Sequence, residues 1–205
     1  MLNLGEAIIK YVEAQKYQVF VGKDELNIIY IEGMSTDGTI NSDEPNHFND
    51  LRMIIEFKNG IPTIAGRWQA TTEPGFHFTD NPMNPNGAAR IAFGQYRSWQ
   101  IGIHGMSEPH EALVQVSQVP VHRDYNRDMI RTGDRIDNGL FGINQHHGYD
   151  HPQNDIHTAS AGCLVGRTRA GHSEFMKMIK RDRRYQSNPH FIFSTTIVAG
   201  NKLGL

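Results

Sequence analysis

The residues that could carry out chemistry concentrate around a single cysteine. Cys163 is the only cysteine among 205 residues, and the small residues Ser160 and Gly162 stand just before it. A His-His-Gly triplet that begins with His146 and His147 lies upstream. A thiol becomes a strong nucleophile as the thiolate, and a histidine within hydrogen-bond reach can accept its proton. The spacing predicts a cysteine nucleophile with a histidine base, and the alternative is a cysteine that serves only as a small buried apolar residue.

The small residues before Cys163 predict a second part of a catalytic site. Without bulky side chains, main-chain N–H groups can approach a substrate carbonyl and stabilise the negative charge that forms on it. We expect the N–H groups of Gly162 and Cys163 to supply this oxyanion hole, with His147 as the base. Candidates for the group that orients the imidazole are a main-chain carbonyl and the side chains of Asn144, Asp150 and His157.

The segment around Cys163 resembles the catalytic motif of the L,D-transpeptidase family, the YkuD-like enzymes that remodel bacterial peptidoglycan. In that family a strand ends in His-Gly, and a short loop leads to Ser/Thr-His-Gly-Cys and then to an Arg or Asn. Here GINQHHG is similar to the first part and SAGCLVGR to the second. The resemblance implies that Cys163 is the nucleophile and His147 the histidine before Gly. It also implies Ser160 and Gly162 in the turn and Arg167 as the polar residue that follows.

One departure from the family motif bears on the base. Ala161 stands where the family has a histidine, so His157 or His146 could take its part. His104, in the sequence IGIHG, also resembles a His-Gly strand end. We therefore expect His104, His146, His157 and Arg167 to contact the substrate.

The reaction implied by the resemblance is acyl transfer on the stem peptides of peptidoglycan, with either water or an amine as acceptor. We expect hydrolysis, as in a cell-wall peptidase or a phage-type lysin, and the alternative is a transpeptidase that forms cross-links. A cross-linking enzyme that works outside the membrane normally needs an export signal, and MLNLGEAIIKYVEAQ lacks the basic start and unbroken apolar run of one. The chain would then act on the cell wall after release from the cytoplasm, without a cofactor.

A cluster of histidines and acids offers a different class of enzyme, a zinc-dependent cell-wall hydrolase. Zinc needs three or four converging donors, typically at regular spacing such as two His one helical turn apart. Gly148 and Pro152 disfavour a helix in this segment, so no metal site is predicted. The cluster consists of His146, His147, His151, His157, Asp150 and Asp155.

Two further alternatives rest on other residues. A non-catalytic wall-binding module could stack sugars on Trp68, Trp99 and the tyrosines, although two tryptophans in a chain of this size more often belong to the core. A calcium loop would also need Gly and Glu at positions held here by Met129 and Arg135, which predicts an ordinary turn. The alternating residues that suggest such a loop are Asp124, Asn126 and Asp128.

Charge and hydropathy exclude some partners. Lys and Arg total 20 and Asp and Glu 22, which gives a formal net charge of −2, so no overall field attracts nucleic acid or an anionic membrane. No segment approaches the ~20 apolar residues of a membrane span. Seven Lys or Arg against two acids in residues 163–185 indicate either a solvated basic helix or contact with the anionic cell wall. Eight acids and one Arg lie in residues 24–56.

The predicted helices and strands that position Cys163 indicate one α+β domain over residues 1–205. We expect a mainly antiparallel, partly barrelled sheet with peripheral helices, as in L,D-transpeptidases. Helical spacing of apolar residues predicts helices near 3–16 and 172–184, the first with a capping box of Asn3 and Glu6. A Lys-Asn-Gly turn at 58–60 predicts a hairpin between two of the strands. Turn-rich connections are expected at 71–90 and 122–139. Strands are expected at 26–31, 51–57, 61–71, 99–104, 112–121, 140–146 and 191–198.

Overall fold

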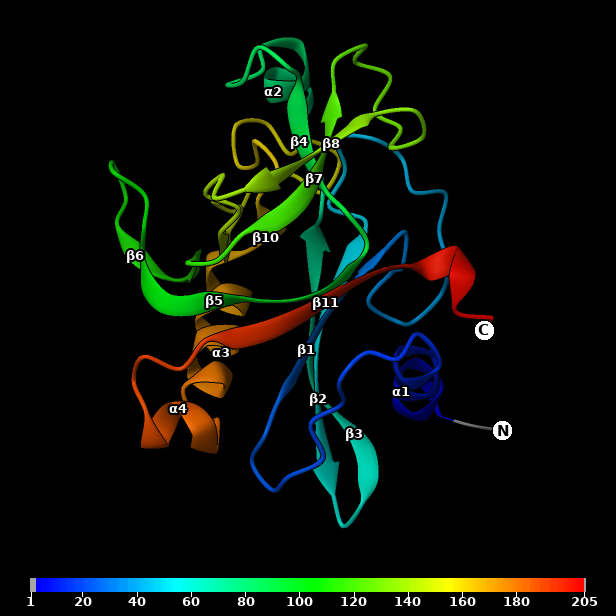
Figure 1. The fold of residues 1–205 in the computed structure, drawn as a ribbon, viewed down its shortest axis with the longest axis vertical. Helices are drawn as coiled ribbons and strands as arrows, with labels where there is room; N and C mark the ends of the chain where they lie inside the picture. The colour runs from blue at the N-terminus through cyan, green and yellow to red at the C-terminus, as the bar shows by residue number, and fades with distance from the viewer. Residues whose placement is uncertain (1–2, 205) are drawn as a thin grey trace.

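The structure, a computed structural model, describes residues 3–204. Over these residues the chain forms an α+β fold with a mostly antiparallel sheet and few helices (Figure 1). The helices are α1 (Leu4–Ala14), α2 (Phe76–Asp80), α3 (Arg169–Ile179), α4 (Arg183–Ser187) and the 3-10 turn η1 (Gly200–Lys202). The first strands are β1 (Asn27–Glu32), β2 (Asp50–Lys58), β3 (Ile61–Thr71), β4 (Ala88–Ile91), β5 (Gly94–His104) and β6 (His110–Gln115). The others are β7 (Val119–Asp124), β8 (Arg135–Gly139), β9 (Gln145–His147), β10 (Leu164–Gly166) and β11 (Phe193–Ala199).

Eight of the strands close into a barrel in the order β1-β11-β5-β6-β9-β10-β3-β2. Two neighbouring pairs of strands in the barrel, β1 with β11 and β9 with β10, are parallel. The other neighbouring pairs of the barrel are antiparallel. The remaining strands form a separate sheet in the order β4-β7-β8, which lies at one end of the barrel (Figure 1). The predicted α+β class with a mainly antiparallel sheet is confirmed.

Several local predictions are confirmed because they depend on neighbouring residues alone. The predicted hairpin is formed by β2 and β3, and its turn residues Asn59 and Gly60 both have positive φ, 52° and 80°. This is the backbone that a two-residue hairpin turn needs and that Asn-Gly tolerates. The capping box at the start of α1 is also present, with the Asn3 side chain accepting from the Glu6 N–H.

Other predicted elements are wrong in extent. The expected strand at 112–121 is two strands, β6 in the barrel and β7 in the small sheet. Only β9 forms within the expected strand at 140–146, and the expected helix at 172–184 is divided into α3 and α4 at Asp182. The buried Asp182 carboxylate accepts from the N–H groups of Leu26 and Arg184, so it begins a new helix and ties it to the segment before β1. The short strands β4, β8 and β10 were not predicted, because three to five residues are too few to show the alternation of apolar and polar residues that indicates a strand.

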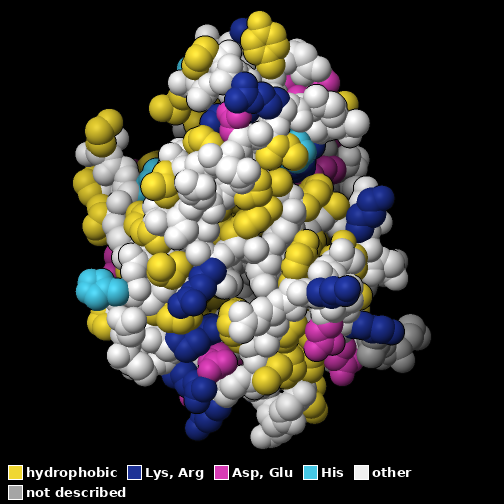
Figure 2. All heavy atoms as spheres, viewed as in Figure 1, with side chains coloured by type: hydrophobic (Ala, Val, Ile, Leu, Met, Phe, Trp, Pro, Cys, Tyr) yellow, Lys and Arg dark blue, Asp and Glu magenta, His cyan; other side chains and the backbone are white. Residues whose placement is uncertain are grey.

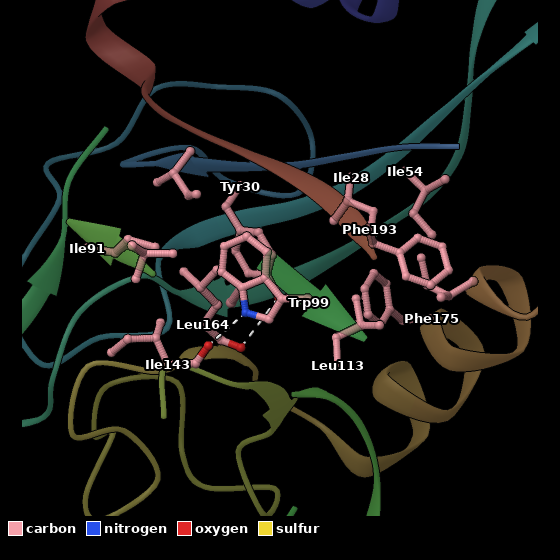
Figure 3. Close-up of a cluster of buried hydrophobic side chains, with 14 of the residues drawn as sticks. Ile28, Tyr30, Ile54, Ile91, Trp99, Leu113, Ile143, Leu164, Phe175 and Phe193 are labelled. Carbon is pink, nitrogen blue, oxygen red and sulfur yellow. Dashed lines mark hydrogen bonds between the residues drawn. The ribbon is translucent and has the colours of Figure 1, made fainter. Parts of the chain in front are cut away.

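The barrel encloses the main core. Trp99 is fully buried within it, and its indole N–H donates to the carbonyl of Ile143 at 2.7 Å, as Figure 3 shows. Apolar side chains from strands on all sides and Phe175 from α3 surround this ring. Trp99 is therefore enclosed and cannot stack sugars as the wall-binding alternative requires, whereas Trp68 packs against Phe175 but stays partly exposed. A second cluster lies between the outer face of β1 and β2 and the buried side of α1.

The basic segment 163–185 does not form an isolated positive surface. Acids from distant parts of the sequence contact it: Arg183 pairs with Glu25 at 2.6 Å and Lys180 with Glu111 at 2.7 Å. On the face shown in Figure 2, Lys and Arg side chains lie beside Asp and Glu side chains. Ion pairs with acids from several parts of the chain therefore neutralise part of the basic segment. Among residues 3–204, no helix combines the length and apolar character needed to cross a membrane.

Candidate active site around Cys163

The turn before Cys163 is held by Ser160 and Gly162. The buried Ser160 hydroxyl accepts from the Gly162 N–H at 3.1 Å and donates to the carbonyl of Cys163 at 3.0 Å. Gly162 has a φ of 122°, and a Cβ there would overlap the carbonyl of Ala89 in β4. The small residues predicted from the sequence are therefore required by the close approach of the turn to the small sheet. The N–H of Gly162, which was expected in the oxyanion hole, donates within the turn to Ser160.

Cys163 lines a cavity of about 470 Å³. Its sulfur donates a hydrogen bond to the carbonyl of Gly142 at 3.3 Å. Part of the residue remains exposed to the cavity, but protein atoms surround the sulfur closely, and this desolvation raises the pKa of the thiol to about 11. The thiol is thus neutral at pH 7 and needs a base to become a nucleophile.

His146 is the histidine that shares this cavity with Cys163. It lies in β9 opposite Val165 of the parallel strand β10, and Val165 packs in one small cluster with Cys163. Its Nδ1 lies 2.8 Å from the carbonyl of His147, which can only accept, so Nδ1 carries the proton and Nε2 is the free acceptor. Burial and the neighbouring His104 hold the pKa of His146 well below its usual value. A neutral imidazole with a free Nε2 has the form that a general base requires.

His147, the base expected from the sequence, lies elsewhere. Successive side chains of a strand point to opposite faces, and His147 lines a different cavity of about 250 Å³ with His110 and His172. Its Nδ1 accepts from the N–H of Tyr149 at 3.3 Å, and its Nε2 faces the Glu108 carboxylate at 3.6 Å. Burial lowers its pKa to about 4. Of the two adjacent histidines, His146 and not His147 therefore lines the cavity of Cys163.

His104 and Asn144 lie beside His146. The ring of His104 stacks on that of His146 with 3.8 Å between centroids and 14° between planes, and it lines the same cavity. The Asn144 side chain donates to His104 Nδ1 at 3.0 Å and accepts from the Gln115 N–H at 2.8 Å. His104 Nε2 therefore carries the proton and can donate. Of the candidates for orienting the base, the main-chain carbonyl contacts His146, whereas Asn144 orients His104.

Two predicted substrate-binding residues lie outside the cavity. Arg167 donates to the Gln69 side chain at 2.7 Å and to the carbonyl of His151 at 3.1 Å, and it lines a separate groove beside Trp68. His157 is exposed, and its ring lies 5.0 Å from that of His151. Neither residue lines the cavity of Cys163.

Sequence reasoning missed cavity residues that come from other elements. Arg123 in β7 and Phe141 in the loop before β9 both line the cavity of Cys163. No spacing in the sequence could have identified them, because tertiary contacts between distant segments bring them there.

Metal binding finds no support in the geometry. Within residues 3–204, no group of three or more His, Cys, Asp or Glu side chains is arranged to hold a metal ion. The residues of the suggested calcium loop hydrogen-bond one another instead, with the N–H of Asp128 donating to Asp124 at 3.1 Å. Of the histidine and acid cluster, His146 and His147 line separate cavities.

Comparison of the chain with protein-family models, with curated proteins and with solved structures produced no match. The resemblance to L,D-transpeptidases is therefore carried by the motif residues alone.

Proposed function

We propose that the protein is a cysteine-dependent acyl-transfer enzyme that acts on the stem peptides of peptidoglycan, with an L,D-transpeptidase-like barrel. The observation that carries the proposal is the shared cavity of Cys163 and His146, in which the thiol is neutral and the imidazole keeps Nε2 free. The substrate class comes from the resemblance of the motif around Cys163.

The reaction would begin with attack of the Cys163 sulfur on a peptide carbonyl carbon. His146 Nε2 accepts the thiol proton as the S–C bond forms, since burial keeps the thiol protonated until then. The proton then passes to the leaving nitrogen as the C–N bond breaks, which leaves a thioester on Cys163. Water attacks the thioester, His146 accepts the proton of water, and the proton returns to the sulfur when the acid leaves.

The negative charge on the carbonyl oxygen needs hydrogen-bond donors. His104 Nε2–H is available because Nδ1 is occupied by Asn144, and its ring lies against that of His146. The N–H of Cys163 is a second donor. Removal of one such donor typically slows the chemical step about 10²–10³-fold.

Hydrolysis is the proposed outcome, and cross-linking is the second candidate. A cavity of about 470 Å³ is the size that usually holds one small ligand. Hydrolysis needs only water beside the acyl group, whereas cross-linking requires a second stem peptide at the thioester.

The test is mass spectrometry of muropeptides after incubation of the chain with purified peptidoglycan, which reports the bond attacked and whether the product is cut or joined. We expect Cys163→Ala to abolish the change. The adjacent histidines provide a matched pair, because both are buried in β9 and only one lines the cavity of Cys163.

His146→Gln should slow turnover about 10²–10⁴-fold, as expected for loss of a general base, while His147→Gln should retain most of it. Full turnover by Cys163→Ala would overturn the proposed function. Loss of turnover in His147→Gln but not in His146→Gln would overturn the assignment of the base.

A further inference from the structure

Arg123 is the charged side chain at the cavity of Cys163. It lies in β7, its side chain is only 5% exposed, and it lines the cavity. Its Nε donates to the Asp137 carboxylate at 3.1 Å, and its guanidinium lies over the ring of Phe141 at 4.5 Å from the centroid. Its Nη1 lies 3.5 Å from the carbonyl of Gly87, the outer limit of a hydrogen bond. For Nη2, the described part of the chain offers no hydrogen-bond acceptor.

Two short paths connect Arg123 to the thiol. Ala89 of β4 pairs directly with Arg123, and Gly162 of the turn packs against Ala89. Directly paired residues of antiparallel strands have Cβ atoms about 4.5–5.5 Å apart and point to the same side. On the other path, the guanidinium covers Phe141, and the next residue, Gly142, accepts the hydrogen bond of the Cys163 thiol. Arg123 and Cys163 both line this cavity.

Arg123 is the only Lys or Arg among the described residues that line the cavity. No Asp or Glu stands among the described residues that line it. The one carboxylate that pairs with Arg123, that of Asp137, also pairs with Arg135 at 3.0 Å, so two cations share one anion. A buried guanidinium with a free edge binds a carboxylate strongly, because both groups are planar and the site excludes water.

We propose that Arg123 binds a free carboxylate of the acyl donor, so that the enzyme selects stem peptides with an ionised carboxylate next to the bond that Cys163 attacks. The inference rests on the proposed function and adds the chemical class of the substrate. Such a carboxylate is either the C-terminal one of the stem peptide or a side-chain carboxylate of its diamino acid. Arg123 would fix the donor so that its carbonyl faces the sulfur.

The test uses three synthetic stem tetrapeptides that differ only in charge: one with both carboxylates free, one with a C-terminal carboxamide, and one with the diamino-acid carboxylate as an amide. Release of product is measured by mass spectrometry for the wild-type chain, Arg123→Gln and Arg135→Gln. Binding of the same peptides to Cys163→Ala is measured by calorimetry, which needs no turnover. Arg135→Gln is the matched control, because Arg135 contacts the same Asp137 but is 71% exposed and does not line the cavity.

We expect the wild-type chain to process the free peptide roughly ten- to hundredfold faster than one of the two amides, as for loss of a charged hydrogen bond. The slow amide identifies the carboxylate that is bound. Arg123→Gln should lose this discrimination and Arg135→Gln should keep it, with melting temperatures to confirm that both are folded. If Arg123→Gln does not fold, the discrimination between the peptides is measured with Arg123→Lys, and the binding of the three peptides to Cys163→Ala provides the second measurement.

Equal processing and equal binding of all three peptides would overturn the inference and leave the proposed function intact. Preferential binding of the free peptide without turnover of any peptide would support the carboxylate site and overturn the proposed function. Neither binding nor turnover of any peptide would overturn both.

Discussion

Gly162→Ala tests whether the turn before Cys163 is fixed by its contact with the small sheet. Gly162 has a φ of 122°, where a residue with a side chain is strained. A Cβ at this position would lie 3.0 Å from the Cβ of Ala89 and closer still to the Ala89 carbonyl oxygen. The carbonyl belongs to a strand paired with β7, so it cannot rotate away. The turn itself must shift.

The expected cost has two parts. A residue with a side chain in a left-handed conformation costs about 1–2 kcal/mol, and the overlap with the carbonyl raises the total to about 2–4 kcal/mol. In a chain of this length 1 kcal/mol lowers the melting temperature by about 2–4 °C, so we expect a drop of roughly 5–15 °C. A displacement of the thiol by about 1 Å should slow turnover about a hundredfold.

The assay compares Gly162→Ala with Gly133→Ala in thermal unfolding and in turnover of peptidoglycan. Gly133 also has a positive φ, 91°, but no heavy atom lies within 4 Å of the Cβ that would be added. Gly133→Ala should therefore lose only the conformational part of the stability and retain full turnover. Equal melting temperatures for the two variants, or undiminished turnover by Gly162→Ala, would refute the reasoning.

Three further predictions follow from buried polar groups. Because burial raises the pKa of the Cys163 thiol from 9.0 to about 11, alkylation by iodoacetamide at pH 7.5 should be about a hundredfold slower than for an ordinary thiol and should rise about tenfold per pH unit; a plateau at neutral pH would contradict this. Asp182→Ala leaves the N–H of Leu26 without its acceptor, and urea unfolding should show a loss of about 3 kcal/mol or more, whereas an unchanged midpoint would argue against a structural role. His172 accepts from the buried Arg52 at 3.1 Å, and burial and that cation lower its pKa to about 2. Below pH 6.5 the unfolded chain binds a proton at His172 that the folded chain does not bind. The free energy of unfolding should therefore fall by about 1.4 kcal/mol per pH unit as the pH drops. His172→Asn should flatten this slope, and an unaltered slope would contradict the prediction.

The sequence by itself predicted the features that depend on neighbouring residues. The turn of Asn59 and Gly60 and the capping box of α1 each need only a few adjacent side chains, and both are present. The small residues before Cys163 were also recognisable, since a turn that passes close to other main chain excludes side chains. The need for small residues in this turn could be predicted from neighbouring residues, although the strand that the turn approaches could not.

Only the tertiary structure decided which groups share the cavity of Cys163. His146 and His147 are adjacent and chemically identical, and alternation along a strand guarantees that they point to opposite faces without saying which face holds the thiol. That choice is made by the pairing of β9 with β10 and by closure of the barrel. Arg123 reaches the cavity through a third pairing, that of β4 with β7. Such pairings join residues far apart in the chain, and their free energy comes from packing of the whole fold, so no short stretch of sequence encodes them.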